Sequence, residues 1–349
     1  MSSSHVRRVL VFPGQGSQRV GMAKDLLESW PRVVGDVLEE ASEAIQTNLG
    51  RLMTEGPADR LTQTQFAQPA ILSHSIAVLR VLQTQFAQPA ILSHSIAVLR
   101  VLQQSRQQER DFDVTEQASL AMGHSLGEYS ALVATHAMPF DEAVRLVHFR
   151  GQAMQRAVPA GAGAMAALMP VTPESAEEIC SLAAERTGLV CQVANYNSSK
   201  QSVISGDASA VEAAIAIAKA EKKVRRAVPL DVSAPFHCAL MQPAAAELAE
   251  RLQATLPSLQ PPRVPVVWNV EAEASEKDLQ GIIDVLTKQV VEPVRWSQSV
   301  DYALAGGATS FLELGFGGVL SGLVKQHAPS THTESLGTVE QLTAFLKQS

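Results

Sequence analysis

The sequence lacks the long apolar segments and the N-terminal targeting segment that would mark a membrane protein or an exported protein. No run of about 18 apolar residues occurs among its 349 residues, so no membrane-spanning helix is predicted. Only residues 1–8 precede the first predicted strand, which is too short a segment for a signal or transit peptide. We therefore expect a cytoplasmic protein with no membrane partner.

Cysteine and net positive charge are also lacking. The three cysteines, Cys180, Cys191 and Cys238, are odd in number and do not have the paired spacing of metal ligands. This pattern argues against a disulfide framework and against a zinc site. A net charge of −7 makes nucleic acid an unexpected partner, so any anionic ligand must meet a local basic patch.

Apolar residues are abundant enough to build a large core. With 46% hydrophobic residues, the chain is predicted to form one large domain and a smaller one. Alternating helix and strand patterns predict the α/β class. Residues 160–232 instead follow the order β-α-β-β-α-β, which predicts an inserted ferredoxin-like subdomain. The large domain, residues 1–159 and 233–349, is then discontinuous and contains a parallel sheet.

The strongest chemical signal is the segment Gly-His-Ser-Leu-Gly at residues 123–127. An apolar run at 118–122 precedes it and a helical pattern at 128–135 follows it. Strand, sharp turn and helix are the setting of a nucleophile elbow, in which the glycines allow close backbone approach and the serine hydroxyl is exposed. The helix start also favours negative charge. Ser125 is therefore the candidate nucleophile of a hydrolase-like domain.

A tandem duplication follows the first helices. Residues 64–83 and 84–103 are the same string, TQFAQPAILSHSIAVLRVLQ. One perfect pair is typical of a recent duplication or a sequence-assembly artefact, because solenoid repeats diverge and number three or more. Each copy predicts a helix that begins at its Gln-Pro step, over 70–82 or 90–102. Only one copy can fill a given place in the core, so the other lengthens the layer, lies on the surface or destabilises the fold.

A serine nucleophile needs a base. Of the nine histidines, His237 stands out because it follows a turn-like segment after the last strand of the predicted subdomain. A loop residue there can reach a cleft between domains. These residues leave His237 open between a base and a structural histidine. They also leave Arg150 open between a carboxylate ligand and a side chain extending to solvent.

Six separated segments match one known family, in order along nearly the whole chain. They are VFPGQGSQ at 11–18, GHSLGEYS at 123–130, AVRLV at 143–147 with Arg150-Gly151, GAMA at 163–166, FHCALM at 236–241 and PVRW at 293–296. Together they resemble the malonyl-CoA:acyl carrier protein transacylases. Six motifs in register are far more specific than an elbow alone.

The resemblance implies an acyltransferase that moves a malonyl group from malonyl-CoA to the phosphopantetheine thiol of acyl carrier protein, for fatty acid or polyketide synthesis. Ser125 would attack the thioester and form a malonyl-serine ester in a ping-pong cycle. His237 would act as general base and then as general acid. Arg150 matches the arginine that binds the malonyl carboxylate.

The resemblance also implies how the intermediate and the base are held. Backbone N–H groups of Gln15 and Leu126 would form the oxyanion hole. The backbone carbonyl of Gln289 would orient His237, so that a Ser-His dyad suffices. Asp231 is an alternative orienting group because it lies near His237 in the sequence.

Three positions concern the shape of the pocket or depart from the family pattern. The glutamine of the family's Gln-Pro-Ala motif, expected near the active site, occurs twice, as Gln68 and Gln88. Gln68 keeps the usual spacing from residues 56–57 and Gln88 keeps the helix next to the downstream strand, so both stay open. Phe236 would narrow the pocket near the substrate α-carbon. The segment 315–317, Gly-Phe-Gly in place of Gly-Pro-Gly, is expected to loosen a turn.

Partners follow from the same resemblance. We expect no metal and no cofactor, since malonyl-CoA is a substrate. We also expect a monomer that binds acyl carrier protein transiently. No attachment sequence for a carrier and no second catalytic block occurs, which indicates a free-standing enzyme. A hypothetical docking patch for the acidic carrier or for CoA phosphates consists of Lys222, Lys223, Arg225 and Arg226, although a solvated charge run has the same pattern.

Two other functions are compatible with the same sequence motifs. A serine hydrolase or thioesterase would use water as acceptor and release free malonate, but a carboxylate-binding arginine argues against it. A catalytically silent scaffold would result if the extra copy displaced the layer beneath Ser125. An error of about 1 Å can cost on the order of a hundredfold in rate.

Overall fold

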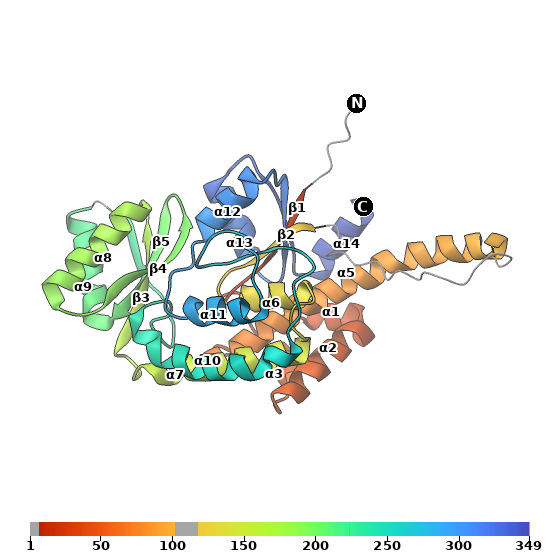
Figure 1. Ribbon diagram of the computed structural model, residues 1–349, viewed down its shortest axis with the longest axis horizontal. Helices are drawn as coiled ribbons and strands as arrows, with labels where there is room; N and C mark the ends of the chain where they lie inside the picture. Colours follow the sequence, from red (N-terminus) through yellow and green to blue (C-terminus); the bar gives the residue numbers. More distant parts are fainter. Residues whose placement is uncertain (1–6, 102–117, 223, 349) are drawn as a thin grey trace.

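Two separate sheets, with helices packed around them, make up the molecule (Figure 1). The structure is a computed structural model that describes residues 7–101, 118–222 and 224–348, with side chains for all of these except residues 85–101 and 348. One sheet is parallel and the other is antiparallel. The predicted α/β class and parallel sheet are confirmed.

The parallel sheet has five strands in the order β7-β2-β1-β8-β9. They are β1 (Arg8–Phe12), β2 (Ala118–Gly123), β7 (Val266–Val267), β8 (Ser310–Leu314) and β9 (His332–Leu336). Side chains alternate between the two faces of β1: Val9 and Val11 join one apolar cluster, and Leu10 and Phe12 join another. Both faces are covered, which explains why β1 reads as an unbroken apolar run.

Helices cover the two faces unequally. One face packs on α12 (Trp296–Ala305) and α13 (Val319–His327). The other face shares its apolar cluster with α1 (Lys24–Ser29), α2 (Pro31–Ala44), α3 (Leu49–Glu55), α4 (Ala58–Leu61), α5 (Thr64–Val101), α6 (Gly127–Ala134), α7 (Phe140–Ala157), α10 (Gln242–Thr255), α11 (Leu279–Gln289) and α14 (Val339–Gln348). Short 3-10 turns, η2 (Ala239–Met241) and η3 (Leu256–Ser258), flank α10.

The antiparallel sheet lies between α7 and α10 in the chain. Its strands are β3 (Gly163–Met169), β4 (Cys191–Ser198), β5 (Gln201–Asp207) and β6 (Arg226–Pro229), in the order β4-β5-β3-β6. Helices α8 (Pro173–Thr187) and α9 (Ala208–Ala220) share its apolar cluster. The predicted succession of strands and helices is therefore the observed one. Backbone hydrogen bonds from Tyr196 N to Val294 O (2.9 Å) and from Val294 N to Ala194 O (2.9 Å) tie β4 to the segment before α12.

The C-terminal part contains more structure than the sequence patterns predicted. The sequence patterns predict no strand around His332, but residues 332–336 form β9, which pairs with β8. Strand β9 alternates exposed and buried positions too weakly to be distinguished from a loop by pattern alone. Phe316, in the turn after β8, packs edge-on against His74 at 5.7 Å and lies under the Arg19 guanidinium at 4.3 Å. A proline could not make these ring contacts.

The predicted helix starts in the duplicated region are wrong. Helix α5 begins earlier, at Thr64, and runs through both copies to Val101, so the two Gln-Pro steps lie inside one helix. Proline lacks the N–H that would bond to the carbonyl four residues earlier, and that carbonyl needs another partner. For Pro69 the carbonyl belongs to Gln65, and Nδ1 of His148 on α7 contacts it at 2.6 Å. A tertiary contact therefore supports the helix across this proline.

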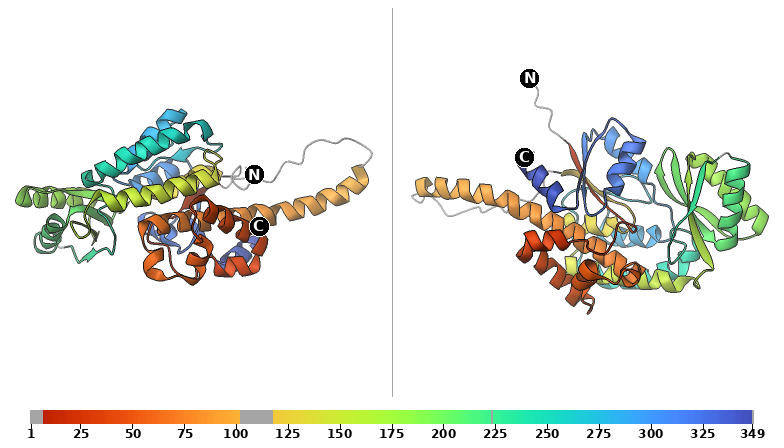
Figure 2. Two further views of the ribbon diagram at one scale, coloured as in Figure 1. Left: turned by 90° about the horizontal axis from the view of Figure 1, so that it is seen from below. Right: turned by 180° about the vertical axis from the view of Figure 1, so that it is seen from behind.

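The first copy fills the core. Ala67, Ala70, Leu72, Ala77 and Val78 have no exposed surface, and Ile71 is 1% exposed. The continuation of α5 extends away from the rest of the molecule (Figures 1 and 2). In the described part of the chain, no helix is both long and apolar enough to cross a membrane. The surplus copy thus lengthens a helix rather than displacing the layer beneath β1 and β2.

Matched substitutions in the two copies test this assignment. Ile71→Ala removes a buried side chain and should lower the free energy of unfolding by about 2–5 kcal/mol. Ile91→Ala changes the same position of the second copy and should cost under about 1 kcal/mol. Urea unfolding of both variants measures the difference. The opposite order of effects would show that residues 84–103 fill the core.

Candidate active site

Ser125 lies on a sharp turn between β2 and α6, as the elbow pattern predicts. Its φ of 52° is in the left-handed region, which a side-chain-bearing residue adopts only at a cost. A Cβ on Gly123 would lie 1.9 Å from the carbonyl carbon of Gly127, and a Cβ on Gly127 would lie 2.0 Å from the carbonyl oxygen of Phe12. Both glycines are therefore required for β1, β2 and α6 to approach this closely.

His237 meets the serine from the loop before η2. Its Nε2 lies 2.8 Å from Ser125 Oγ, and its Nδ1 lies 2.8 Å from the carbonyl oxygen of Gln289. A carbonyl only accepts hydrogen bonds, so Nδ1 carries the proton and Nε2 is free to accept one from the serine. Burial, followed by the charge of Arg150, lowers the pKa of His237 to about 3, which keeps the imidazole neutral at ordinary pH. Asp231 lines the cavity, but the group at Nδ1 is Gln289.

Arg150, on α7, brings a buried positive charge to Ser125. It is 2% exposed, and its Nη2 lies 3.2 Å from Ser125 Oγ. Its remaining side-chain hydrogen bonds go to uncharged oxygens, from Nη1 to Gln68 Oε1 and from Nη2 to Gln289 Oε1, each at 3.0 Å. Burial lowers its pKa, but an arginine remains protonated. Since no carboxylate in the described part of the chain bonds to it directly, the guanidinium is available to a carboxylate on a ligand.

The structure places one of the two alternative glutamines in the site. Gln68 is 1% exposed and contacts both Arg150 and, through Nε2, the Met154 sulfur at 3.9 Å. The side chain of Gln88 lies outside the described residues. Packing in the core decides this point, because the two copies are identical in sequence.

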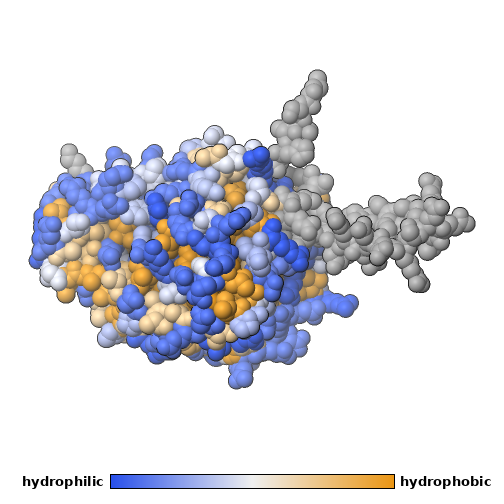
Figure 3. All heavy atoms as spheres, in the orientation of Figure 1, coloured by the Kyte–Doolittle hydropathy of each residue, from blue (hydrophilic) through white to orange (hydrophobic). Residues whose placement is uncertain are grey.

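A cavity of about 490 Å³ opens above these residues. Gln15 and Leu126 line it beside Ser125, as expected for the two residues proposed to form an oxyanion hole, and Phe236 lines it beside His237. Asn195 of β4 and the segment 230–233 after β6 close it from the antiparallel sheet. The cavity is therefore built jointly by the two sheets. On the face drawn in Figure 3, apolar patches lie among hydrophilic residues, both near the middle of the face and toward its left side.

Sequence reasoning missed the groups that hold the elbow from behind. Asn269, after β7, accepts the Ser125 N–H at Oδ1 (2.6 Å) and donates from Nδ2 to the Gly123 carbonyl (2.6 Å). Glu128, inside the quoted GHSLGEYS motif, is fully buried and bonds to the backbone N–H of Asn269. Glu128 is a charged residue in an otherwise uncharged helical segment, and this is a signal that the sequence offers. No local pattern marked Asn269.

Metal binding has no support in the described part of the chain. There, no three His, Cys, Asp or Glu side chains are grouped so that they could hold a metal ion. The two side chains that bond to Ser125 Oγ are the imidazole of His237 and the guanidinium of Arg150, and the guanidinium suits the carboxylate of an organic acid.

Comparisons with known proteins agree with this geometry. The family model described as acyl transferase domain matches residues 9–99 and 81–342, two segments that overlap inside the duplicated region. The malonyl CoA-acyl carrier protein transacylase of Escherichia coli strain K12 is 41% identical over 97% of this chain and 98% of its own. The structure of the same enzyme from Coxiella burnetii is 37% identical, with a TM-score of 0.85 and 99% of each chain covered.

One further solved structure shows a related protein with its partner. It is a malonyl-transacylase in complex with a type II polyketide synthase acyl-carrier protein. That transacylase is 36% identical to this chain, with a TM-score of 0.84 and coverage of 98% of this chain and 100% of the other.

The buried, neutral His237 predicts a pH dependence of stability. Its pKa is about 3 in the folded protein and about 6.5 when unfolded, so below pH 6.5 only the unfolded chain takes up the proton. The free energy of unfolding should then fall by about 1.4 kcal/mol per pH unit on account of this residue. His237→Gln removes that contribution, and urea unfolding between about pH 7 and about pH 5 should show a shallower loss. Equal losses in the two proteins would contradict the assignment.

Proposed function

The chain belongs to the malonyl CoA-acyl carrier protein transacylase family, and from this we propose that Ser125, His237 and Arg150 carry out its reaction. The protein is an acyltransferase that moves the malonyl group of malonyl-CoA to the phosphopantetheine thiol of acyl carrier protein, supplying fatty acid or polyketide synthesis. The observation that supports the residue assignment best is the meeting of Ser125 Oγ with His237 Nε2 and Arg150 Nη2.

The first half of the reaction acylates the serine. His237 Nε2 takes the proton of Ser125 Oγ as the oxygen attacks the thioester carbonyl of malonyl-CoA. Backbone N–H groups of Gln15 and Leu126 stabilise the oxyanion of the tetrahedral intermediate. When the C–S bond breaks, His237 gives the proton to the CoA thiolate. A malonyl-serine ester and CoA result.

The second half reverses these roles. The phosphopantetheine thiol of the carrier protein loses its proton to His237 and attacks the ester carbonyl. Collapse of the intermediate returns the proton to Ser125 Oγ and releases malonyl-carrier protein. The Gln289 carbonyl keeps Nδ1 protonated throughout, so the dyad works without a carboxylate.

Arg150 selects the acyl group. The malonyl carboxylate pairs with the buried guanidinium, whereas an acetyl group would leave that charge without a carboxylate. The difference is worth several kcal/mol, on the order of a hundredfold or more in binding. Gln68 and Gln289 hold the guanidinium without neutralising it. Phe236, 8% exposed in the cavity wall, narrows the space around the α-carbon.

We also propose the finer features that the resemblance implies. The enzyme needs no cofactor besides its substrates, is a cytoplasmic monomer and meets its carrier protein transiently. The sheet order β4-β5-β3-β6 with two helices supports a ferredoxin-like subdomain. The strand-elbow-helix at Ser125 supports a hydrolase-like large domain.

The acidic carrier protein approaches next to the antiparallel sheet in this proposal. Arg225 and Arg226 are exposed, and the strand β6 that begins at Arg226 leads directly into the cavity wall at 230–233. Lys222 pairs with Glu178, and Lys223 lies outside the described residues. The two arginines therefore form the part of the predicted patch best placed to attract acidic groups.

Acylation by malonyl-CoA tests the residue roles. Intact-protein mass should increase by one malonyl group in the wild type and stay unchanged in Ser125→Ala. Arg150→Met keeps much of the volume but removes the charge, and should slow malonylation on the order of a hundredfold or more while acetylation from acetyl-CoA slows far less. Accumulation of free malonate without an adduct would favour a hydrolase.

Charge reversal tests the docking patch. Arg225→Glu combined with Arg226→Glu should lower kcat/KM for the carrier protein about tenfold or more, with a weaker dependence on salt, and leave acylation by malonyl-CoA largely intact. Lys24→Glu with Arg32→Glu, two exposed positions on α1 and α2, makes the same change in net charge and is the control. Equal effects of the two pairs would remove the patch from the proposal.

A further inference from the structure

A buried carboxyl lies directly behind the site and takes no part in the proposed reaction. Glu128 stands in the first turn of α6, and none of its surface is exposed. Its Oε1 accepts the backbone N–H of Asn269 at 2.5 Å, and its Oε2 accepts an N–H from Nε2 of Gln289. Burial raises the pKa of Glu128 to about 8, against the opposing effect of these donors and of Arg150. Above that pH both carboxylate oxygens can only accept.

The side-chain amide of Gln289 has two possible orientations, which exchange its oxygen and its nitrogen. In the observed one, Nε2 faces two acceptors, the Glu128 carboxylate and the Ser125 carbonyl at 2.9 Å. Its Oε1 faces a donor, Nη2 of Arg150, at 3.0 Å. The reverse orientation would place oxygen against oxygen at Glu128 and N–H against N–H at Arg150, leaving buried groups unpaired.

We propose that Glu128 is a positioning residue for acyl-group selection, because it orients the Gln289 amide and through it the Arg150 guanidinium. The inference rests on the proposed function, in which Arg150 binds the malonyl carboxylate. Arg150 depends on this support because, among the residues that the structure describes, its buried Nε has no hydrogen-bond partner and its two terminal nitrogens donate to Gln68, Gln289 and Ser125. Loss of the Gln289 oxygen would let the Arg150 guanidinium rotate away from the substrate carboxylate.

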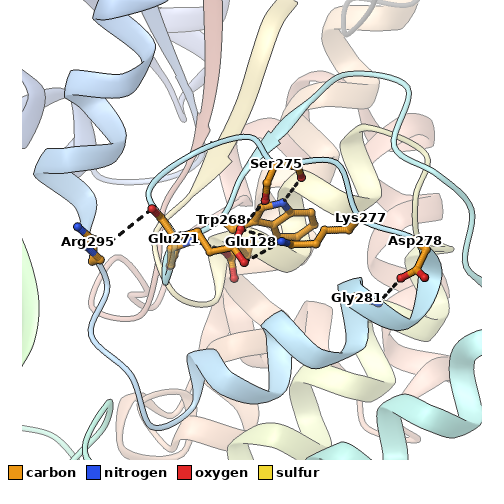
Figure 4. Close-up of polar contacts among 9 residues, drawn as sticks. Glu128, Trp268, Glu271, Ser275, Lys277, Asp278, Gly281 and Arg295 are labelled. Carbon is orange, nitrogen blue, oxygen red and sulfur yellow. Dashed lines mark hydrogen bonds and ion pairs between the residues drawn. The ribbon is translucent and has the colours of Figure 1, made fainter.

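A second arm of the same carboxyl supports the nucleophile. Glu128 holds the backbone of Asn269, whose side chain spans the elbow from Gly123 to Ser125. Figure 4 shows Glu128 beside the loop that follows β7, where Lys277 pairs with Glu271 at 2.7 Å. This arm affects malonyl and acetyl transfer equally, since both use Ser125. Only the Gln289 arm affects the ratio between them.

Glu128→Gln distinguishes the effect of the hydrogen bond to Gln289 from that of the hydrogen bond to Asn269. The variant keeps the size of the side chain, but its amide has one oxygen and one N–H₂ group. The backbone N–H of Asn269 and the Nε2 group of Gln289 both need an acceptor at this position, so one of them would face another donor. The Gln289 amide can relieve the conflict by turning over, which brings its own N–H₂ toward Arg150. We expect the malonyl-to-acetyl ratio of acylation rates to fall about tenfold or more, with the loss concentrated in the KM for malonyl-CoA.

The assay compares acylation of each protein by malonyl-CoA and by acetyl-CoA at about pH 8.5, which lies above the pKa of about 8 that burial gives Glu128. Glu313→Gln is the matched control. Glu313 is also a fully buried glutamate, and it accepts two backbone N–H groups, from Leu320 and Ser321, away from the site. The control should lose stability and keep its ratio.

Gln289→Met keeps the test decisive if Glu128→Gln does not fold. It preserves the backbone carbonyl at His237 and removes the amide, so it should lose the ratio to a similar extent. In the double variant, Glu128→Gln should add little, because the orientation it controls no longer exists.

An unchanged ratio in either folded single variant would overturn the positioning role. A wild type that forms no malonyl adduct would overturn the proposed function itself, and this outcome is visible before any variant is made.

Discussion

The site is organised around one constraint, a buried positive charge whose hydrogen bonds to the described residues go to uncharged oxygens. Arg150 comes from α7, yet its partners come from α5, the elbow and the end of α11. Burying a cation without a counter-ion is costly, and the surrounding amides reduce that cost without cancelling the charge. The same charge helps to keep His237 neutral. In the proposed reaction, the selection of an anionic acyl group and the neutral state of the base therefore have a common physical origin.

The backbone of Ser125, the proposed nucleophile, depends on close packing of the elements around it. Ser125 keeps a left-handed backbone because β1, β2 and α6 meet too tightly for any side chain at Gly123 or Gly127. Asn269, in the loop after β7, bonds to both Gly123 and Ser125 and so bridges the turn. The cavity then forms where the antiparallel sheet approaches this elbow, so neither sheet alone makes a substrate site. The duplicated segment leaves this arrangement intact because its surplus length continues α5 outward (Figure 1).

Sequence patterns predicted the parts of the fold whose residues follow a local rule. The elbow with the apolar strand that leads into it and the order of elements in the antiparallel sheet were predicted and are present. The start of α5 was missed because Pro69 normally opens a helix, and only His148 on another helix supports the free carbonyl of Gln65. Strand β9 was missed because its weak alternation gains meaning only beside β8.

By itself, the sequence determined which residue types are available: a serine between two glycines, a histidine on a late loop and an arginine in an apolar helix. These follow from local backbone chemistry and from motifs held in order. Only the tertiary structure decided which identical glutamine reaches Arg150, and that Glu128 and Asn269 hold the elbow from behind. Identical segments differ only in their surroundings, and hydrogen bonds between residues more than a hundred positions apart leave no periodic trace in a sequence.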